Sequence, residues 1–317
     1  MNLNALELFC GIGGFAAAVA GTNVRVVGAL DQSPAALEVY RLNFPTHDAR
    51  PADLERITAT ELASFGADLW WLSPPCQPYS VRGRRQDLAD LRARSLLRIL
   101  EVLPEISAER LPQHLALENV AGFAGSAAQE RLAGFLADRG YQFRERLLCP
   151  TELGVPSRRP RYYLLASRAG LAPDAPPLAH PPLRLGDYLD PLPDCAVLDE
   201  LQVPAAVLAR FGPGFRILDP ADPEAYTTCF TAGYGKSLMH AGSYLRCGEG
   251  ARRFSPAEIA RLLHFPPEFR FPVALSLRKR WHLLGNSLSV AAVQEVLRAL
   301  PGIVQPAGPP PVPERSA

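Results

Sequence analysis

The chain has 317 residues, of which 48% are hydrophobic, so it can bury a sizeable core and is not a disordered protein. Its 33 basic and 32 acidic residues leave a formal net charge of +1, which excludes binding to nucleic acid through bulk charge alone. No long apolar run, secretion signal or paired cysteine spacing appears, so we expect a cytoplasmic protein without a membrane span, disulfide framework or metal site.

The first half of the chain alternates short apolar runs with helical patterns. The expected strands cover 5–9, 24–30, 68–72, 114–117, 141–148 and 161–166, and the expected helices cover 92–103, 129–138 and segments that begin near 15 and 33. Strands and helices that alternate in this way predict an α/β fold with a doubly wound, mainly parallel, Rossmann-like sheet. In such a sheet ligands bind beyond the carboxyl ends of the strands, which is where the motifs described below fall.

The composition changes near residue 171, where a proline-rich stretch begins and regular patterns fade until about residue 222. Helical patterns return over 255–263, with Ser255 as the N-cap and Glu258 three residues later, and again from about 287 to 300. The proline-rich residues 301–317 are expected to form a disordered tail. The sequence therefore predicts one regular α/β domain followed by a smaller and less regular one.

A glycine turn follows the first predicted strand and opens a helix. Gly11, Gly13 and Gly14 allow the backbone to approach a ligand and leave N–H groups free at the start of the helix. Asp31 ends the next strand, where a carboxylate can accept hydrogen bonds from ribose hydroxyls. A purely structural turn is the alternative, since the spacing is not the dinucleotide fingerprint. Together with Asp31, the turn favours a nucleoside-bearing cofactor.

A proline-boxed cysteine, Cys76, follows the strand at 68–72. A free thiol titrates near pH ~8.5 and needs positive neighbours to attack at neutral pH. Arg82, Arg84 and Arg85 follow closely, although a solvated charge cluster is the alternative meaning of such a run. The sequence therefore indicates Cys76 as a candidate nucleophile held in a rigid loop.

Two further motifs carry charged residues: Glu118 at the end of the strand at 114–117, and the pair Arg159 and Arg161 at the start of the strand at 161–166. Glu118 lies between apolar residues at a strand end, where desolvation would raise the pKa of its carboxyl, as a general acid near neutrality requires. The alternative role for Glu118 is a helix N-cap. Arg159 and Arg161 alternate, which places both guanidiniums on one face, suited to a carbonyl oxygen, a base edge or phosphate, unless they are simply surface charge.

Together these motifs, in this order, resemble those of the cytosine-5 methyltransferase family, which uses S-adenosylmethionine. Gly285-Asn286-Ser287 is similar to the family's closing motif, so the likeness extends over nearly the whole chain. The resemblance implies a catalytic and cofactor-binding domain over 1–170, a small target-recognition domain over 171–270, and a segment over 271–300 that returns to the catalytic domain.

Within that family, the chain most resembles the tRNA enzymes of the aspartate-tRNA type, which were once classed as DNA methyltransferases. Thr228–Gly235 resembles their Cys-Phe-Thr-x-Gly-Tyr-Gly signature, and 254–269 is similar to the same group's segment. The segment between Arg168 and Arg252 is short for a domain that reads duplex sequence. Tyr79-Ser80 departs from the tRNA pattern. The resemblance implies methylation of a cytosine in a tRNA anticodon loop, with a solitary or restriction-associated DNA cytosine-5 methyltransferase as the alternative.

The resemblance also implies a mechanism and a set of site residues. Cys76 would add to carbon 6 of cytosine, Glu118 would protonate ring nitrogen 3, and Arg161 with Arg159 would hold the ring oxygen. S-adenosylmethionine, which becomes S-adenosylhomocysteine, would contact Phe9, Ile12, Gly13, Gly14, Asp31, Gln32, Asp53, Leu54, Ser73, Asn286 and Ser287. Further basic residues are expected to track the RNA backbone, namely Arg92, Arg94, Arg252, Arg253, Arg278, Lys279 and Arg280. We expect no metal cofactor and a monomer.

Overall fold

The computed structural model of the protein describes residues 2–79, 87–173, 183–190 and 200–304. Arg82, Arg84 and Arg85, which follow Cys76 closely, and most of the predicted tail lie outside these residues. The chain divides into two compact units. The first combines the N-terminal part up to Leu148 with segments that begin at Pro160 and Val293, and the second combines Cys149–Arg159 with a segment that ends at Ala292.

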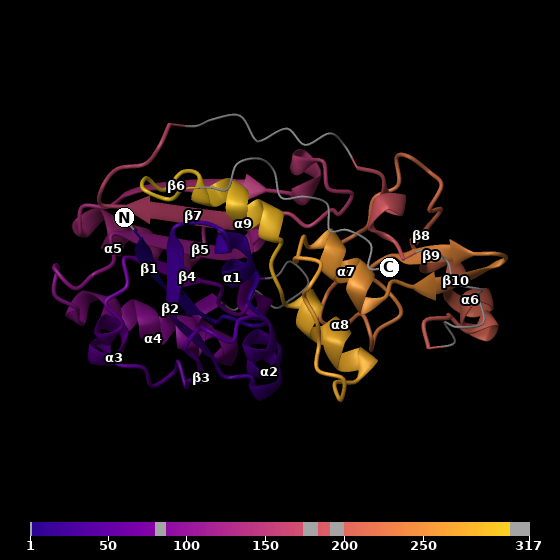
Figure 1. The fold of residues 1–317 in the computed structure, drawn as a ribbon, viewed down its shortest axis with the longest axis horizontal. Coiled ribbons are helices and arrows are strands. Elements are labelled where there is room, and N and C mark those ends of the chain that lie inside the picture. Colours follow the sequence, from indigo (N-terminus) through magenta and orange to yellow (C-terminus); the bar gives the residue numbers. More distant parts are fainter. Residues whose placement is uncertain (1, 80–86, 174–182, 191–199, 305–317) are drawn as a thin grey trace. The chain divides into compact units, whose positions relative to one another are not determined.

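The first unit is built on a seven-stranded sheet with the strand order β3-β2-β1-β4-β5-β7-β6 (Figure 1). The strands are β1 (Leu3–Leu8), β2 (Val24–Asp31), β3 (Ala49–Pro51), β4 (Leu69–Leu72), β5 (His114–Val120), β6 (Gln142–Leu148) and β7 (Arg161–Ser167). β1 to β5 pair in parallel, and β7 runs antiparallel to both β5 and β6. The structure thus confirms the predicted mainly parallel α/β sheet.

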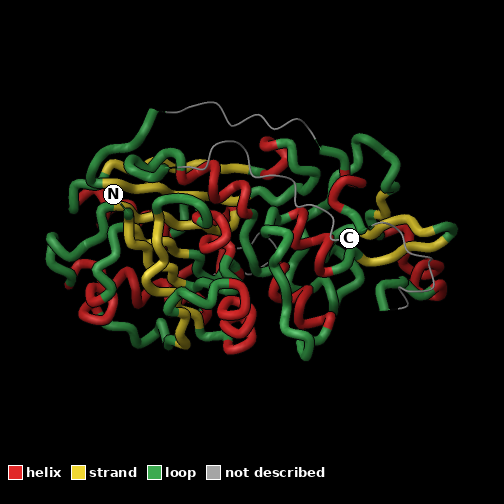
Figure 2. Tube along the Cα trace, viewed as in Figure 1, coloured by secondary structure: helices red, strands yellow, loops and turns green. Residues whose placement is uncertain are grey.

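Helices connect the strands of this sheet and flank it (Figure 2). They are α1 (Gly14–Val19), α2 (Pro34–Asn43), α3 (Ala59–Ser64), α4 (Arg94–Val102) and α5 (Ala127–Asp138), and α9 (Val290–Leu297) brings the chain back to the first unit. Capping explains where several of them begin. The Ser33 hydroxyl accepts from Ala36 N, and Thr58 and Glu61 form a reciprocal capping box at α3.

The two faces of the sheet bury different partners. On one face, Leu6, Trp70 and Leu117 join a core cluster with apolar side chains of α3, α4 and α5. The opposite face carries Trp71, whose ring stacks on Phe15 of α1 at a centroid distance of 5.1 Å. This alternation follows from the pleat of the strands, which sends successive side chains to opposite faces.

The second unit has less regular structure, as the sequence predicts. It contains a three-stranded sheet of β8 (Ile217–Leu218), β9 (Tyr244–Cys247) and β10 (Gly250–Arg253), with helices α6 (Ala205–Phe211), α7 (Pro256–Leu262) and α8 (Leu277–Gly285). The predicted capping box at the start of α7 is confirmed, because Ser255 Oγ accepts from Glu258 N and the Glu258 carboxylate accepts from Ser255 N. The sequence patterns did not predict β3, α3, α6 or α8.

The boundaries between the units differ from the predicted ones at two places. Residues 149–159 belong to the second unit, because Arg158 N donates to Thr227 O and Thr227 N donates to Pro156 O. The return to the first unit occurs at Val293 and not near 271, because α8 is held in the second unit by the bond from Trp281 Nε1 to Phe254 O. Both differences arise from hydrogen bonds between residues that are distant in the sequence.

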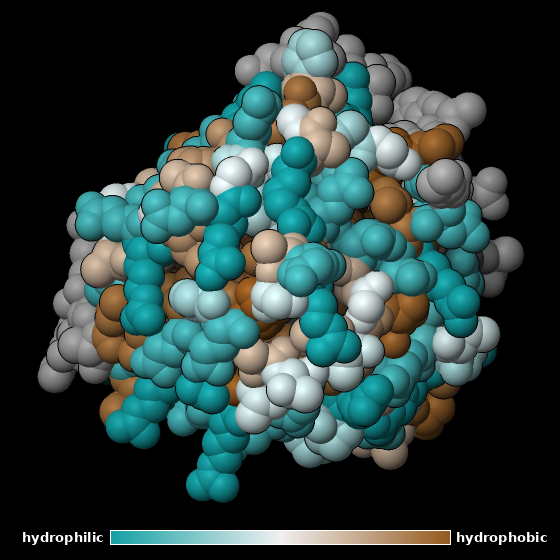
Figure 3. Space-filling view, turned by 90° about the vertical axis from the view of Figure 1, so that its left-hand side faces the viewer, coloured by the Kyte–Doolittle hydropathy of each residue, from teal (hydrophilic) through white to brown (hydrophobic). Residues whose placement is uncertain are grey.

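Hydrophilic side chains cover most of the face shown in Figure 3, with smaller hydrophobic areas between them. In the first unit the large apolar side chains with the greatest described exposure are Leu91, Val304 and Leu147, at 66%, 65% and 58%. They belong to different elements of the unit. Across the described ranges, no helix is both long and apolar enough to cross a membrane.

Candidate active site

The glycine turn after β1 has a backbone conformation that favours glycine. Phe9, Gly11 and Gly13 have φ values of 59°, 53° and 89°. A Cβ added at Gly13 would lie 2.4 Å from the ring of Phe44, whereas one added at Gly11 would meet no atom within 4 Å. The turn is therefore tightly packed at Gly13 and open at Gly11, which fits close approach of a nucleoside cofactor. Ile12 and Gly14, the other predicted contacts of this turn, are buried.

Asp31 ends β2 and holds this turn directly. Its Oδ2 accepts from Gly11 N at 2.8 Å and its Oδ1 accepts from Ser33 N at 2.7 Å. Burial raises the pKa of the Asp31 carboxyl, and the bonds from Ser33 and Gly11 oppose that shift. Each carboxylate oxygen can accept a further bond, so Asp31 can hold the turn and still receive a ribose hydroxyl.

The loop after β3 lies beside Asp31. Pro51 is the register partner of Asp31, and Ala52 N donates to Asp31 O at 3.0 Å. Asp53 follows and is exposed, while Leu54 is buried in the core. Gln32, next to Asp31, is also exposed. The structure thus brings these four predicted cofactor residues to the carboxyl ends of β2 and β3.

Ser73 occupies the corresponding position after β4. Its N–H donates to Leu8 O at 3.2 Å, and its hydroxyl accepts from Trp71 Nε1 at 2.7 Å. Because Leu8 ends β1, Ser73 lies beside the glycine turn. The predicted cofactor residues of the first unit therefore follow four neighbouring strands, as the doubly wound sheet requires.

Cys76 is half-buried in a loop that β5 helps to hold. Tyr79 N donates to Cys76 O at 3.1 Å, and Asn119 Nδ2 donates to Pro74 O at 3.2 Å. A Cβ added at Gly122 would lie 2.2 Å from Tyr79 O, so the segment after β5 packs flush against this loop. The contact through Asn119 places the thiol-bearing loop next to the end of the strand that carries Glu118.

A positively charged side chain, Arg92, interacts electrostatically with the Cys76 thiol. Arg92 is paired with Asp90 through bonds of 2.8 and 2.6 Å. The pKa of Arg92 is raised, first by the hydrogen bond to Asp90 and to a lesser extent by the charge of Cys76. Arg92, which was expected to track the RNA backbone, thus also interacts electrostatically with Cys76.

Glu118 and Arg161 form an ion pair in which Glu118 is buried and Arg161 is half-buried. Glu118 is 7% exposed, and its Oε1 lies 3.2 Å from Arg161 Nε. The antiparallel pairing of β5 with β7 brings the two together, because Val120 is the register partner of Arg161. Arg161 also donates to Pro160 O at 2.8 Å. The structure therefore joins two of the predicted catalytic residues.

Arg159 has different partners from Arg161. It is 4% exposed and lies in the second unit, where its Nη1 donates to Cys229 Sγ and Phe230 O, each at 3.1 Å. Its Nη2 donates to the carbonyl oxygens of Gly285 and Ser287. The two arginines thus have different partners, because Arg159 precedes β7 and joins two segments of the second unit.

The closing motif also lies in the second unit. A Cβ added at Gly285 would lie 2.2 Å from the carbonyl carbon of Thr231, so only glycine permits this contact. Asn286 is the exposed C-cap of α8, and its Nδ2 lies 3.4 Å from His282 Nε2. Ser287 is buried. The contact of Asn286 and Ser287 with the cofactor remains a prediction.

Some arginines expected to track RNA are occupied elsewhere. Arg252 is 3% exposed and forms a bidentate pair with Glu258 at 2.7 and 2.8 Å, so the expectation that it contacts a nucleic-acid backbone is wrong. Arg280 donates to the carbonyl oxygens of Leu275, Pro272 and Val273. Arg278 on α8 is exposed and remains suited to that role.

Tyr40 and Phe44, which the sequence motifs did not single out, shape the glycine turn. Tyr40 Cδ2 and the Phe44 ring lie 3.2 and 2.4 Å from the position that a Cβ would take at Gly13. Tyr40 lies in the last turn of α2 and Phe44 is the C-cap of that helix, so their spacing of four residues brings both to the same side. This spacing, after the Ser33-Pro34 helix start, is the signal that could have identified them.

Comparisons with known proteins agree with this site. Residues 3–189 match the family described as C-5 cytosine-specific DNA methylase. The tRNA (cytosine(38)-C(5))-methyltransferase of Homo sapiens is 30% identical, and the alignment covers 94% of this chain and 99% of that protein. A DNA (cytosine-5)-methyltransferase of Dictyostelium discoideum is 28% identical over 94% of this chain and 93% of its own length.

The fold comparison gives the same result. The crystal structure of the S. pombe Dnmt2 methyltransferase superposes with a TM-score of 0.83 and is 30% identical, over 94% of this chain and 98% of that one. The glycine turn, the Cys76 loop and the Glu118–Arg161 pair all lie in the matched region. The chain therefore belongs to the cytosine C-5 methyltransferase family and is an S-adenosylmethionine-dependent methyltransferase.

Proposed function

We propose that the enzyme methylates carbon 5 of a cytosine in the anticodon loop of a tRNA. The observation that carries this is the similarity along nearly the whole chain to a relative named for methylation of tRNA cytosine 38. The Cys-Phe-Thr-Ala-Gly-Tyr-Gly segment at 229–235 supports it. Physical chemistry favours it too, because the bases of a single-stranded loop are already splayed and are less costly to extrude than those of a duplex.

The reaction begins with the Cys76 thiolate. Its sulfur forms a bond to carbon 6 of the cytosine, and the electron pair of the carbon 5–carbon 6 double bond moves towards nitrogen 3. This addition makes carbon 5 nucleophilic, which the intact aromatic ring does not permit. Covalent catalysis of this kind divides one difficult step into two easier ones.

Glu118 and Arg161 stabilise the charge that develops on the ring. In its protonated form the Glu118 carboxyl donates a proton or hydrogen bond to nitrogen 3, and the Arg161 guanidinium binds the ring oxygen at carbon 2. Their ion pair of 3.2 Å holds both side chains in place before the base arrives. Because Glu118 is buried and the Arg161 side chain is only 14% exposed, each interaction is stronger than it would be in water.

When bound, S-adenosylmethionine would supply an electrophilic methyl group, and carbon 5, made nucleophilic by Cys76, would receive it, with S-adenosylhomocysteine as the product. A base then removes the carbon 5 proton, the double bond re-forms, and Cys76 leaves as a thiolate. The glycine turn, Asp31, the loop at Asp53-Leu54 and Ser73 hold the cofactor, with Asn286 and Ser287 at its methionine end. No residue role in this scheme requires a metal ion.

Arg159 acts as a positioning residue in this scheme. Its guanidinium holds the Cys229 sulfur and the Phe230 carbonyl oxygen against the carbonyl oxygens of Gly285 and Ser287 through four hydrogen bonds. The second unit recognises the tRNA, and exposed basic residues such as Arg278 contact its phosphates.

The enzyme acts as a monomer in the cytoplasm.

A DNA cytosine-5 methyltransferase is the second candidate. The relative from Dictyostelium discoideum carries that name, and Ser80 stands where the tRNA enzymes commonly have threonine and the DNA enzymes commonly have serine. Labelled methyl transfer to total tRNA and to genomic DNA, assayed side by side, separates the two. Bisulfite sequencing of the RNA product then identifies the cytosine. Transfer to DNA alone would replace the tRNA proposal with the second candidate.

A further inference from the structure

A buried carboxyl, Glu7, lies beneath the glycine turn and has no part in the methyl transfer described above. It is 1% exposed on β1, and its carboxyl accepts hydrogen bonds from the backbone N–H groups of Phe15 and Ala16. These N–H groups belong to the first turn of α1, whose N-cap, Gly13, provides no capping side chain. Glu7 therefore supplies the cap for the helix that follows the turn.

Tyr40 of α2 connects this carboxyl to the turn. Its hydroxyl lies 2.9 Å from Glu7 Oε2 and 3.1 Å from His47 Nδ1. Its ring contacts Gly13, where an added Cβ would lie 3.2 Å from Tyr40 Cδ2. One fully buried side chain thus contacts the glycine turn and the carboxyl that caps α1.

The single hydroxyl proton of Tyr40 allows two arrangements of this chain of groups. When Glu7 is protonated, its hydroxyl donates to Tyr40 and Tyr40 donates to Nδ1 of a neutral His47. When Glu7 is ionised, Tyr40 donates to Glu7 and His47 Nδ1–H donates to Tyr40. The ionised form binds the N–H groups of Phe15 and Ala16 more strongly, because charge-assisted hydrogen bonds are the stronger kind.

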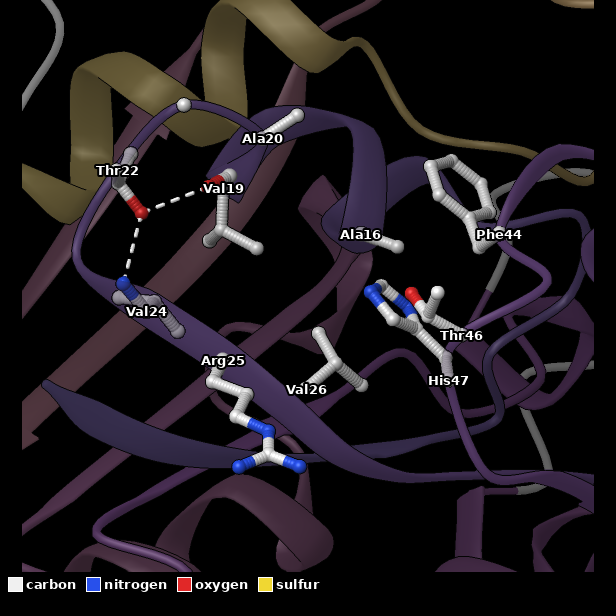
Figure 4. Close-up of a pocket in the computed structure, with 11 residues that line it drawn as sticks. Ala16, Val19, Ala20, Thr22, Val24, Arg25, Val26, Phe44, Thr46 and His47 are labelled. Carbon is white, nitrogen blue, oxygen red and sulfur yellow. Dashed lines mark hydrogen bonds between the residues drawn. The ribbon is translucent and has the colours of Figure 1, made fainter.

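The hydrogen-bonded series Glu7–Tyr40–His47 ends at a surface pocket. His47 lines a pocket of about 340 Å³, where its ring stacks on Phe44 at a centroid distance of 5.4 Å (Figure 4). Ala16 of α1 lines the same pocket. Burial lowers the pKa of His47, which keeps the imidazole neutral and able to accept from Tyr40. A proton can therefore pass between Glu7 and solvent without opening the core.

We propose that Glu7 and Tyr40 are positioning residues for S-adenosylmethionine, because together they hold the glycine turn and the first turn of α1 in the shape that binds the cofactor. His47 is the solvent end of their proton relay. The inference rests on the cofactor assignment and not on the choice of nucleic acid. A failure of the tRNA proposal would leave it untouched.

The surroundings of Glu7 determine how it titrates. Burial raises the pKa of its carboxyl to about 8, and the Tyr40 hydrogen bond opposes that shift. Asp31 faces it from the end of β2, Cys10 faces it from the glycine turn, and burial raises the pKa of both. Since the ionised carboxyl holds the helix more strongly, cofactor affinity is expected to increase as the pH rises through 8.

The test is the dissociation constant of S-adenosylmethionine, measured by calorimetry from pH 6 to 9 on the full chain. In the unaltered enzyme we expect affinity to increase about threefold across this range beyond the change seen in Glu7→Gln, where the Glu7 titration is absent. Titration of the cofactor itself is common to both proteins and cancels in the comparison. Tyr40→Phe, which keeps the ring on Gly13, is expected to weaken binding about tenfold and to move the transition to higher pH.

Tyr141→Phe is the matched control, because it removes a buried hydroxyl that donates to Pro112 O, away from the strand ends that hold the cofactor site. It is expected to bind the cofactor with unchanged affinity. Kinetics give a second readout: Tyr40→Phe should raise the KM for the cofactor about tenfold and change kcat less than twofold. The proposal is overturned if Tyr40→Phe binds as tightly as the unaltered enzyme, if Tyr141→Phe weakens binding as much, or if Glu7→Gln keeps the same pH dependence.

Discussion

The two units position their functional groups by different physical means. In the first unit the backbone hydrogen bonds of the sheet position the functional groups. Ser73 N donates to Leu8 O, and the pairing of β5 with β7 brings Glu118 to Arg161. Backbone hydrogen bonds repeat along each pair of strands, so the positions of residues at the strand ends are fixed by the whole sheet. A side chain at a strand end can therefore be substituted without removing the backbone hydrogen bonds that hold the neighbouring residues.

In the second unit, buried arginine side chains replace much of that backbone pairing. Arg159 binds the carbonyl oxygens of Phe230 and Gly285, and Arg261 binds Tyr188 O at 2.8 Å. A guanidinium carries five donors in a rigid fork, so one residue can hold several loops at once. We therefore expect substitutions of strand-end residues in the first unit to affect chemistry, and substitutions of buried arginines in the second unit to affect stability.

The largest expected effect is on the reaction itself. Cys76→Ala should lower the rate of methyl transfer at least ~10⁴-fold, because no other group can form the bond to carbon 6. The melting temperature and the cofactor dissociation constant should stay unchanged. Cys149→Ala, a half-buried cysteine of the second unit, is the control and should retain full activity. A residual rate close to that of the unaltered enzyme would refute the covalent mechanism.

The stability of the first unit should depend on pH through Glu7. Its pKa is raised from 4.5 to about 8, so between these values the folded chain keeps a proton that the unfolded chain has lost. The free energy of unfolding therefore falls as the pH rises from 4.5 to 8, by on the order of 5 kcal/mol. Urea titrations across this range should show the slope, and Glu7→Gln should flatten it. An equal slope in the variant would show that other groups cause it.

Arg159→Ala should destabilise the protein by about 3 kcal/mol, since it leaves buried carbonyl oxygens without their donor. Arg278→Ala, an exposed arginine of the same unit, should change the free energy of unfolding by less than about 0.5 kcal/mol. Chemical denaturation measures both. If Arg159→Ala keeps full stability and yet loses methyl transfer, the residue acts on the substrate and the contrast between the units is wrong.

Glu118→Gln should slow methyl transfer more than tenfold, because the amide cannot act as the acid, a role that contributes ~10²–10⁴-fold. The amide oxygen can still accept from Arg161, so stability should change little. Glu145→Gln, an exposed residue of β6, is the control. Single-turnover rates on tRNA separate this effect from binding. A change in KM alone would show that Glu118 binds the base without protonating it.

Local sequence patterns predicted the first unit well. The strand at 161–166 appears as Arg161–Ser167, and the capping signals at Ser33 and Ser255 mark true helix starts. These signals depend on residues within four positions of one another, so they do not require knowledge of the tertiary structure. The short edge strand Ala49–Pro51 was missed because three residues carry too little periodicity to be recognised.

The site could be predicted only in part. The order of the motifs brought Asp31, Ser73 and Glu118 to neighbouring strand ends, because a parallel sheet sends those ends to one edge. Alternation along an extended chain did not reveal that Arg159 lies before β7, which begins only at Arg161, and that it binds acceptors in the second unit. Arg252 looked like a surface charge, but Glu258 neutralises it inside the second unit.

The order and chemistry of the motifs, which the sequence alone determined, specify a cytosine C-5 methyltransferase, because a thiol, an acid and a glycine turn on successive strands need no knowledge of distant contacts. Only the tertiary structure decided what Arg159, Glu7 and Tyr40 do. Arg159 meets acceptors 70 to 128 positions away in the chain, and Tyr40 meets Glu7 across 33. Such partners are selected by packing in three dimensions, and no local pattern of residues encodes them.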